Sequence, residues 1–288
     1  MLGAIIGDIV GSVYELNSIK TKYFELFKPN CQFTDDTVMT CAVADAIMNG
    51  GSEANLISSM KKYGRMYPHA GYGGNFRAGL RSSDSEPYNS FGNSSAMRVS
   101  PCAWVMDCVF CARTGMWPSR DLARLSASVT HNHPEVIKGA LAVCDAIFMA
   151  RFYFCGCYIE YSNPIDSDPD ECKRRIKEHI EKEYGYDLSM SLDFIRKDYE
   201  FDETCQGSVP QAIIAFLECK DFEDAIRNAI SIGGDSDTIA AITGSIAEAA
   251  YGIPEDIKLK ALSYLDKPLK DVLRRWKKYM RGDESWMK

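Results

Sequence analysis

Two short runs of carboxylate and hydroxyl side chains are the part of the sequence best suited to chemistry. The first is Thr34-Asp35-Asp36-Thr37, and the second is Gly233-Gly234-Asp235-Ser236-Asp237-Thr238. Each run directly precedes an apolar segment with helical spacing. The simplest interpretation is therefore a helix cap, in which a side-chain oxygen accepts an unpaired N–H group of the first turn. A cap needs one such oxygen, whereas the two runs together hold four carboxylates.

This crowding of carboxylates favours a second interpretation, a site for divalent cations. Neighbouring carboxylates repel one another, and each loses hydration in a partly buried site. A bound cation relieves both effects, and hard oxygen donors suit Mg²⁺, Mn²⁺ or Ca²⁺ better than zinc. Asp235 and Asp237 are two positions apart at a turn and can reach one ion, whereas adjacent Asp35 and Asp36 can serve two. Two ions about 3.5–4 Å apart, bridged by a carboxylate, are common in hydrolases.

A loop at residues 92–98, Gly-Asn-Ser-Ser-Ala-Met-Arg, is the second candidate site. Backbone N–H groups and small hydroxyls in such a turn can hold a diphosphate without a basic patch, although an ordinary surface loop is the alternative. His131 and His133 precede Pro134 at the start of an expected helix, where an anion can bind; packing or capping of the turn is the alternative. Phe91 can stack on an adenine ring or simply pack.

These side chains need elements to position them, and helical periodicity dominates the sequence while strand alternation is scarce. We predict one compact all-α domain covering residues 1–288. Residues 68–101, which are rich in Gly, Ser and Asn, are predicted to form a long ordered loop. The predicted helices are residues 2–13, 36–48, 56–63, 103–111, 119–128, a long helix from Pro134, 170–184, 209–217, 222–230, 239–251, 256–265 and 268–281.

Two of these predicted helices carry a stripe of small residues. Gly3, Gly7 and Gly11 recur at a spacing of four, and Ala240 and Gly244 are part of a similar face after the second acidic run. Such a stripe lets another backbone approach closely. A dinucleotide-binding glycine loop is the alternative for the first stripe, but its spacing is wrong and no strand precedes it. We therefore expect these faces to bring the starts of the two acidic helices together.

Composition excludes several classes of protein. The chain has 288 residues, of which 46% are apolar and 25% charged, which excludes a disordered chain. A net charge of −7 argues against a general nucleic-acid or anionic-membrane binder but leaves room for a nucleotide-sized ligand. The longest apolar stretch, residues 142–159, is broken by Asp145 and Arg151. It is therefore not expected to span a bilayer.

Eleven cysteines without a preceding secretory signal indicate a reduced, cytoplasmic protein. Two pairs, Cys108 with Cys111 and Cys155 with Cys157, have spacings that zinc sites use. Neither pair has a second pair of ligands at a typical distance along the chain. Zinc is therefore not expected at either pair.

In order and spacing, these motifs resemble the ADP-ribosylglycohydrolase family, the family of the dinitrogenase reductase-activating glycohydrolase. The resemblance extends from residue 2 to about residue 252, and the five motifs together are far more specific than any one of them. In chain order they are Gly3-Ala-Ile-Ile-Gly-Asp-Ile-Val-Gly11 with Glu15, residues 34–37, residues 92–98, Thr130-His131, and residues 233–238 followed by the small-residue helix and Tyr251-Gly252.

The resemblance implies an all-α fold with two Mg²⁺ or Mn²⁺ ions. It also implies hydrolysis of the glycosidic bond between ADP-ribose and an acceptor, such as an arginine or serine side chain of an ADP-ribosylated protein or a small conjugate. The metal ligands that it implies are Thr34, Asp35, Asp36, Asp235, Asp237 and Thr238. The residues that it implies for substrate binding are Gly92, Asn93, Ser94, Ser95, Ala96, Met97, Arg98 and His131.

For the reaction itself, we expect Asp36 or Asp235 to act as the general base and Glu15 to protonate or orient the leaving group. Arg98 can either reach a phosphate or hold an acidic side chain in place. Two other functions remain as alternatives: a non-catalytic ADP-ribose-binding or structural protein, and a dinuclear phosphohydrolase that cleaves the diphosphate.

Three positions depart from the family pattern. Ser94 and Ser95 replace a pair of smaller residues in the loop, and Glu248 stands where many members have glycine. Serine adds a hydroxyl donor but lacks the conformational freedom of glycine. None of these departures affects an implied metal ligand.

Overall fold

The computed structural model describes residues 1–82, 86–105, 118–154 and 168–282. Within these ranges the chain forms helices joined by loops, with two isolated β-bridges and no strand, which confirms the all-α prediction. The helices are α1 (Leu2–Gly11), α2 (Asp35–Met48), α3 (Glu53–Met66), α4 (Gly74–Arg81), α5 (Ser94–Met97), α6 (Ser100–Trp104), α8 (Pro118–Ser128), α9 (Pro134–Phe154), α10 (Pro169–Tyr184), α11 (Leu192–Asp198), α12 (Cys205–Leu217), α13 (Phe222–Ile232), α14 (Ser236–Tyr251), α15 (Glu255–Tyr264) and α16 (Lys267–Tyr279).

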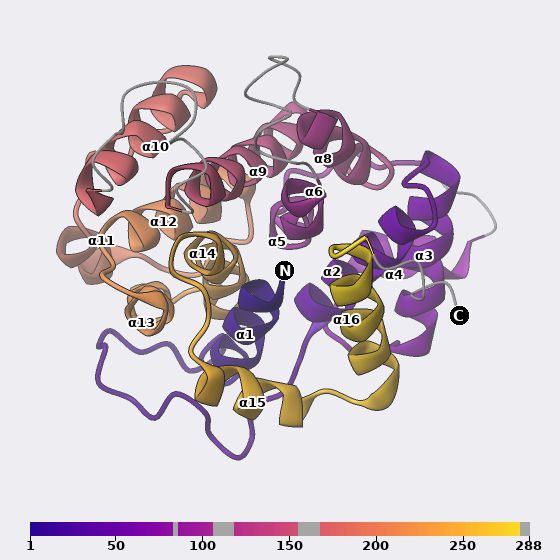
Figure 1. Cartoon of the computed structure of the whole chain (residues 1–288), viewed down its shortest axis with the longest axis horizontal. Helices are drawn as coiled ribbons and strands as arrows, with labels where there is room; N and C mark the ends of the chain where they lie inside the picture. The colour runs from indigo at the N-terminus through magenta and orange to yellow at the C-terminus, as the bar shows by residue number, and fades with distance from the viewer. Residues whose placement is uncertain (83–85, 106–117, 155–167, 283–288) are drawn as a thin grey trace.

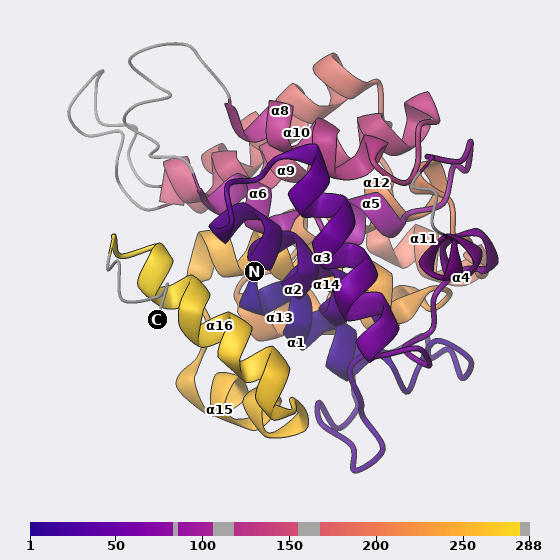
Figure 2. The ribbon, with the colours of Figure 1, turned by 90° about the vertical axis from the view of Figure 1, so that its right-hand side faces the viewer.

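Three central helices form the frame of the molecule, and other helices surround them (Figure 1). All residues of α1 after Leu2 are buried, as are residues 36–48 of α2 and residues 236–247 of α14. The helix α14 contacts α1, α9, α12 and α13, while α2 contacts α1 and α3. The last two helices cover the frame from one side, where α15 contacts α1 and α16 contacts α2 (Figure 2).

The glycine stripe of α1 packs directly against α14, as its spacing predicts. A Cβ atom added to Gly3 would lie 2.1 Å from the carbonyl oxygen of Gly244, and one added to Gly7 would lie 2.0 Å from that of Ala240. Further along, a Cβ at Gly11 would lie 2.5 Å from the Cα of Asp237. Any side chain at these positions would therefore push the two backbones apart. This contact fixes the end of α1 against the start of α14.

Most predicted helices are confirmed within a few residues, but the long loop predicted at residues 68–101 is wrong. That segment contains α4 and α5, and α6 begins within it. The sequence of α4 includes Gly74 and Gly79, which are poor helix formers. Its one buried residue, Leu80, packs over Gly64 of α3, where an added Cβ would lie 2.5 Å from a Leu80 methyl group. This tertiary contact outweighs the weak local propensity.

The short helix α11 has no counterpart among the predicted helices. Ser191 caps it by accepting a hydrogen bond from the backbone N–H of Phe194, and only Leu192 and Ile195 are buried. Two buried positions in seven residues give too little periodicity to detect. The helix predicted at residues 103–111 begins earlier, as α6, and residues 106–111 lie outside the described part of the chain.

No helix in the described ranges is long and apolar enough to cross a membrane. The seven cysteines in those ranges are buried and free of disulfide bonds: Cys31, Cys41, Cys102, Cys144, Cys172, Cys205 and Cys219. The two cysteine pairs considered for zinc, at 108 and 111 and at 155 and 157, lie outside the described residues.

Candidate active site

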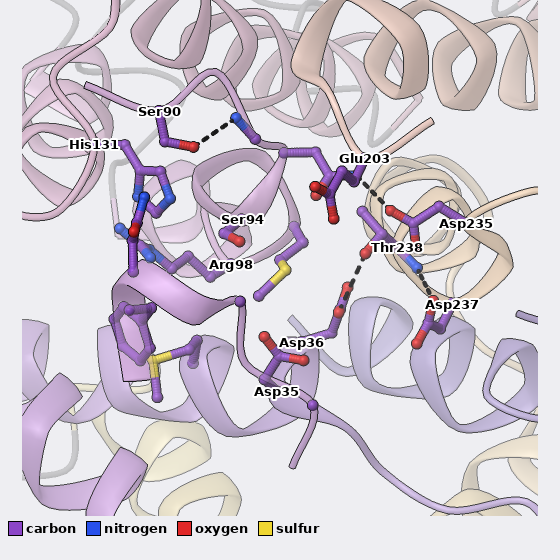
Figure 3. Close-up of a pocket in the computed structure, with 18 of the residues that line it drawn as sticks. Asp35, Asp36, Ser90, Ser94, Arg98, His131, Glu203, Asp235, Asp237 and Thr238 are labelled. Atoms are coloured by element: carbon purple, nitrogen blue, oxygen red, sulfur yellow. Dashed lines mark hydrogen bonds between the residues drawn. The ribbon is translucent and has the colours of Figure 1, made fainter. Parts of the chain in front are cut away.

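The two acidic runs meet at one cavity of about 220 Å³, although almost 200 residues separate them (Figure 3). Close packing of α1 on α14 and contact of α1 with α2 bring the start of α2 next to the start of α14. The carboxylates that line the cavity among the described residues are Glu15, Asp35, Asp36, Glu203, Asp235 and Asp237. Five of the six implied metal ligands therefore line the cavity, whereas Thr34 does not line it, and its Oγ1 lies 3.5 Å from Asp36 Oδ2.

Distances between the oxygen atoms are short enough for shared cations. Carboxylate oxygens of Glu15, Asp235 and Asp237 lie within 4.8 Å of one another, and so do those of Asp8, Asp36 and Asp237. The Thr238 hydroxyl donates to Asp36 Oδ2 at 3.3 Å and thereby joins the two runs (Figure 3). Asp237 belongs to both groups and connects them.

Helix capping explains one end of this cluster but not the other. Thr34 caps α2, because its Oγ1 accepts a hydrogen bond from the backbone N–H of Asp36 at 3.3 Å. Asp235 occupies the equivalent position before α14, but its side chain makes no capping hydrogen bond. Its Oδ2 instead accepts from Asn93 Nδ2 at 2.6 Å. The capping interpretation therefore fails for Asp235, whose carboxylate lies in the cavity wall.

Burial makes this cluster of carboxylates electrostatically costly. It raises the pKa of Asp35 to about 7, with an added contribution from the nearby Asp8 carboxylate. The pKa values of Asp36 and Asp237 rise well above their usual range for the same two reasons, burial and neighbouring negative charge. Asp36 Oδ1 is also buried without a hydrogen-bond partner. An unpaired oxygen among crowded hard donors fits a bound divalent cation.

The loop at residues 92–98 forms another part of the cavity wall, and only some of its residues face the cavity. Gly92, Asn93, Ser94, Met97 and Arg98 line the cavity, and residues 94–97 form α5. Ser95 and Ala96 are buried and do not line it. The Ser95 hydroxyl donates to the carbonyl of Val136 on α9, at 3.1 Å. The structure therefore places these two predicted binding residues behind the wall.

Arg98 and His131 form the polar end of this wall (Figure 3). Arg98 is fully buried, and its Nη2 donates to the carbonyl of Ser126 at 2.7 Å and to Thr130 Oγ1 at 2.6 Å. Its Nε and Nη1 atoms have no partner. The same Thr130 hydroxyl hydrogen bonds to His131 Nδ1 at 2.7 Å. Burial and the nearby Arg98 charge lower the pKa of His131 to about 3, so its ring is neutral.

Sequence patterns assign no role to Asp8 or Glu203, both of which belong to this region. Asp8 is fully buried below the first acidic run and accepts hydrogen bonds from Thr34 and Thr37. An acid inside an apolar glycine-rich helix is the signal that could have marked it. Glu203 lies near Asp235 at the rim of the cavity, and its charge contributes to raising the Asp235 pKa (Figure 3). It belongs to no motif.

Phe91 and His133, two candidate binding residues from the sequence, are not part of the cavity wall. Phe91 is 51% exposed and packs its ring edge-on against His133, with centroids 5.8 Å apart, and neither residue lines the cavity. The stacking of Phe91 on adenine therefore has no support.

Glu248 lies far along α14 and accepts a hydrogen bond from the backbone N–H of Gly3 at 2.8 Å. This departure from the family pattern caps the start of α1.

A family model described as ADP-ribosylglycohydrolase matches residues 1–284. The chain belongs to the ADP-ribosylglycohydrolase family. The match includes both acidic runs, the 92–98 loop and His131, which confirms the resemblance drawn from those motifs. The family description also confirms the prediction of a hydrolase and favours it over a non-catalytic binding protein.

Relatives and a solved structure agree with this membership. The ADP-ribosylhydrolase ARH3 of Mus musculus is 25% identical, and the match covers 88% of this chain and 83% of that protein. The ADP-ribosyl-(dinitrogen reductase) glycohydrolase of Rhodospirillum rubrum is 24% identical, with 95% and 91% covered. A solved structure described as an ADP-ribosylglycohydrolase-related protein complex has a TM-score of 0.59 at 20% identity, covering 91% of this chain and 94% of that one. This last match shows a shared fold.

Proposed function

We propose that this chain is a metal-dependent hydrolase that releases ADP-ribose from an ADP-ribosylated acceptor, such as an arginine or serine side chain of a protein, or from a small conjugate. The observation that carries the proposal is that one cavity is lined both by crowded carboxylates, the proposed cation site, and by a buried arginine, the proposed anion site. The cation site is the acidic cluster with the unpaired Asp36 Oδ1, and the anion site is Arg98 with two unpaired nitrogen atoms. A diphosphate attached to a ribose presents the matching groups.

The residues proposed to hold two Mg²⁺ or Mn²⁺ ions are Thr34, Asp35, Asp36, Asp235, Asp237 and Thr238. Their donors are all hard oxygens, which these ions prefer. When bound, such ions polarise oxygen atoms and make water a stronger nucleophile at neutral pH. Asn93 supports this set, because its amide hydrogen bonds to both Asp235 and Ser208 and so fixes the orientation of the Asp235 carboxylate.

The remaining residues of the cavity are proposed to bind and orient the substrate. Gly92 and Ser94 offer small residues that let the diphosphate and the adjoining ribose approach the wall, Met97 adds an apolar surface, and Arg98 offers charge. Burial lowers the pKa of Arg98 only to about 10, so its guanidinium stays charged at neutral pH. His131, neutral in this environment, can donate a hydrogen bond to a phosphate oxygen, or donate to or accept from a ribose hydroxyl.

Proton transfer is proposed to involve carboxylates on both sides of the cluster. Asp36 or Asp235 acts as the general base. Glu15 is half-buried at the cavity mouth, and its pKa is raised by burial and by the nearby Asp235 charge. A carboxyl group with a raised pKa holds its proton at a higher pH, which suits the protonation or orientation of a leaving group.

For the chain as a whole, we propose that residues 1–288 act as one domain in the cytoplasm. The family match over residues 1–284 supports a single unit. A net charge of −7 supports the absence of general nucleic-acid binding.

Product analysis tests the proposed function. The protein is incubated with Mg²⁺ and with arginine-linked, serine-linked and O-acetyl ADP-ribose, and the products are separated by chromatography. The expected product is free ADP-ribose from at least one substrate. Formation of AMP with ribose phosphate would instead identify a dinuclear phosphohydrolase. Tight ADP-ribose binding without any product would identify a non-catalytic binding protein.

Replacing Ser94 with valine is expected to weaken ADP-ribose binding about tenfold, which corresponds to about 1.4 kcal/mol. A branched side chain crowds the wall that the diphosphate must approach. Isothermal titration with ADP-ribose measures the affinity, and Mg²⁺ affinity is expected to stay unchanged. Ser95→Ala is the matched control, because Ser95 lies behind the wall, where its hydroxyl donates to the carbonyl of Val136. Equal ADP-ribose affinity in Ser94→Val and wild type would contradict a binding role for this loop.

A further inference from the structure

Asp8 is a buried carboxylate to which the proposed reaction assigns no step. It lies in α1 between Gly7 and Gly11, is inaccessible to solvent, and does not line the cavity. A carboxylate in a fully buried apolar helix is destabilising unless hydrogen bonds or an ion compensate it. The groups that compensate Asp8 therefore indicate what it does.

Four donors from the first acidic run converge on Asp8. Its Oδ2 accepts from the backbone N–H of Thr34 at 2.9 Å, from the backbone N–H of Thr37 at 3.0 Å, and from the Thr37 hydroxyl. Its Oδ1 accepts from the Thr34 hydroxyl at 2.7 Å. The two oxygens thus fix both the backbone and the side chains at the first turn of α2.

The bond to Thr34 also determines which way its hydroxyl points. A threonine hydroxyl has one hydrogen and two lone pairs. The hydrogen goes to Asp8, and one lone pair accepts from the backbone N–H of Asp36 at 3.3 Å. The second lone pair is then free on the side of the Asp36 carboxylate, which is 3.5 Å away. A cation can approach Thr34 there without displacing a proton.

We propose that Asp8 is a positioning residue of the metal site and not one of its ligands. It fixes the turn at residues 34–37 and orients the Thr34 hydroxyl so that an unshared lone pair faces the cation. This inference rests on the metal site of the proposed function. Although an Asp8 oxygen lies within 4.8 Å of oxygens of Asp36 and Asp237, both Asp8 oxygens already accept hydrogen bonds from the first acidic run, three at Oδ2 and one at Oδ1.

The helix that carries Asp8 also sets the distance between the two acidic runs. On one side of α1, Asp8 bonds to Thr34 and Thr37. On another side of α1, the backbone of Gly11 contacts the backbone of Asp237. A Cβ atom added to Gly11 would lie 2.5 Å from the Cα atom of Asp237. Loss of the Asp8 bonds would leave the first run free to move relative to the second. Groups behind metal ligands typically change metal affinity about 10- to 100-fold in this way.

Manganese binding to the Asp8→Asn variant tests the proposal without substrate. Asparagine replaces one carboxylate oxygen with an NH₂ group, which cannot accept hydrogen bonds from the N–H and O–H groups of Thr34 and Thr37. Part of the network must therefore break. Titration followed by electron paramagnetic resonance gives affinity, stoichiometry and the spectrum of bound Mn²⁺. We expect the affinity to fall about 10- to 100-fold. The number of ions per chain and the spectrum at saturation are expected to match those of the wild type.

Asp145→Asn is the matched control. Asp145 is equally buried, on α9, and accepts hydrogen bonds from Arg120, His179 and Tyr184, but it does not line the cavity. We expect it to melt at a lower temperature than the wild type and to bind Mn²⁺ with unchanged affinity. Thr37→Val is a milder second variant, which removes one donor to Asp8 and no proposed ligand. We expect it to bind Mn²⁺ several-fold more weakly, and this result remains available if Asp8→Asn does not fold.

Several outcomes would overturn the proposal. Loss of one bound ion, or a changed spectrum at saturation in Asp8→Asn, would make Asp8 a ligand. Wild-type affinity in folded Asp8→Asn or Thr37→Val would leave Asp8 without a positioning role. A wild-type protein that binds no Mn²⁺ would remove the metal site itself. By contrast, a wild type that binds Mn²⁺ as expected but releases no ADP-ribose would contradict only the proposed function.

Discussion

Removal of divalent cations is expected to lower the hydrolysis of ADP-ribosylated substrates by about 10³-fold or more. Metal ions contribute several kcal/mol of charge stabilisation in such reactions, and each 1.36 kcal/mol corresponds to a factor of ten in rate. Asp36→Asn is expected to have a similar effect with Mg²⁺ present. Its Oδ1 is buried without a partner and is the acceptor best placed for an ion. Released ADP-ribose, measured before and after chelation and after Mg²⁺ or Mn²⁺ is restored, checks both results.

An aspartate elsewhere on the same helix provides the control for this experiment. Asp45 lies near the end of α2, where it pairs with Arg275 at 2.6 Å and with Lys62 at 3.3 Å, away from the cavity. Asp45→Asn is expected to be less stable than the wild type but to keep metal-dependent hydrolysis. Full turnover after exhaustive chelation, or restoration by Zn²⁺ alone, would contradict an all-oxygen Mg²⁺ or Mn²⁺ site.

The sequence predicts the frame of the site well because the frame depends on simple local features. A glycine every four residues gives a helix one face without side chains. At this face, Gly3 and Gly7 contact the backbone of α14. Four carboxylates at two helix starts exceed any capping need, and they converge in the structure. Both predictions rest on spacing or residue type alone, without knowledge of distant contacts.

Features that depend on tertiary contacts could not be predicted in the same way. The helix α4 exists because Leu80 packs over Gly64, a contact between separate segments. Within the 92–98 loop, the sequence does not distinguish Ser94, which lines the cavity, from Ser95, which bonds to α9. Likewise, Asp8 differs from an ordinary buried acid only through its bonds to residues more than 25 positions away. Such roles become visible only once helices are placed relative to one another.

The acidic cluster is also expected to couple stability to cations and pH. Without metal, oxygens within 4.8 Å repel by about 3–4 kcal/mol per charged pair at an effective dielectric of about 20. Mg²⁺ binds only the folded site, so at 100 times its dissociation constant it adds about 2.7 kcal/mol of stability. Thermal melts are therefore expected to show a rise of several degrees with Mg²⁺.

The direction of the pH effect follows from the raised pKa values. Asp35 has a pKa of about 7 in the folded protein and 3.8 as its ordinary value, so between these values the folded state binds more protons than the unfolded state. The stability that the folded protein gains from protonating Asp35 is fully present below about pH 4 and is lost as the pH rises through 7. The metal-free protein is expected to melt at a lower temperature at pH 8 than at pH 5, and the Mg²⁺-dependent rise is expected to be larger at pH 8.

Asp235→Asn is expected to separate stability from activity. The substitution keeps the shape of the side chain and removes one negative charge from the cluster, so in chelator at pH 8 the variant should melt at or above the wild-type temperature. Because it removes a proposed ligand and base, it should lose about 10³-fold in hydrolysis and most of the Mg²⁺-dependent rise in melting temperature. Melts of both proteins with and without Mg²⁺, together with one activity assay, check all three effects.

If Asp235 served only as the residue that precedes α14, the Asp235→Asn substitution would leave stability and activity almost unchanged, because asparagine suits that position equally well. An active Asp235→Asn protein with a wild-type response to Mg²⁺ would therefore exclude Asp235 from the metal site.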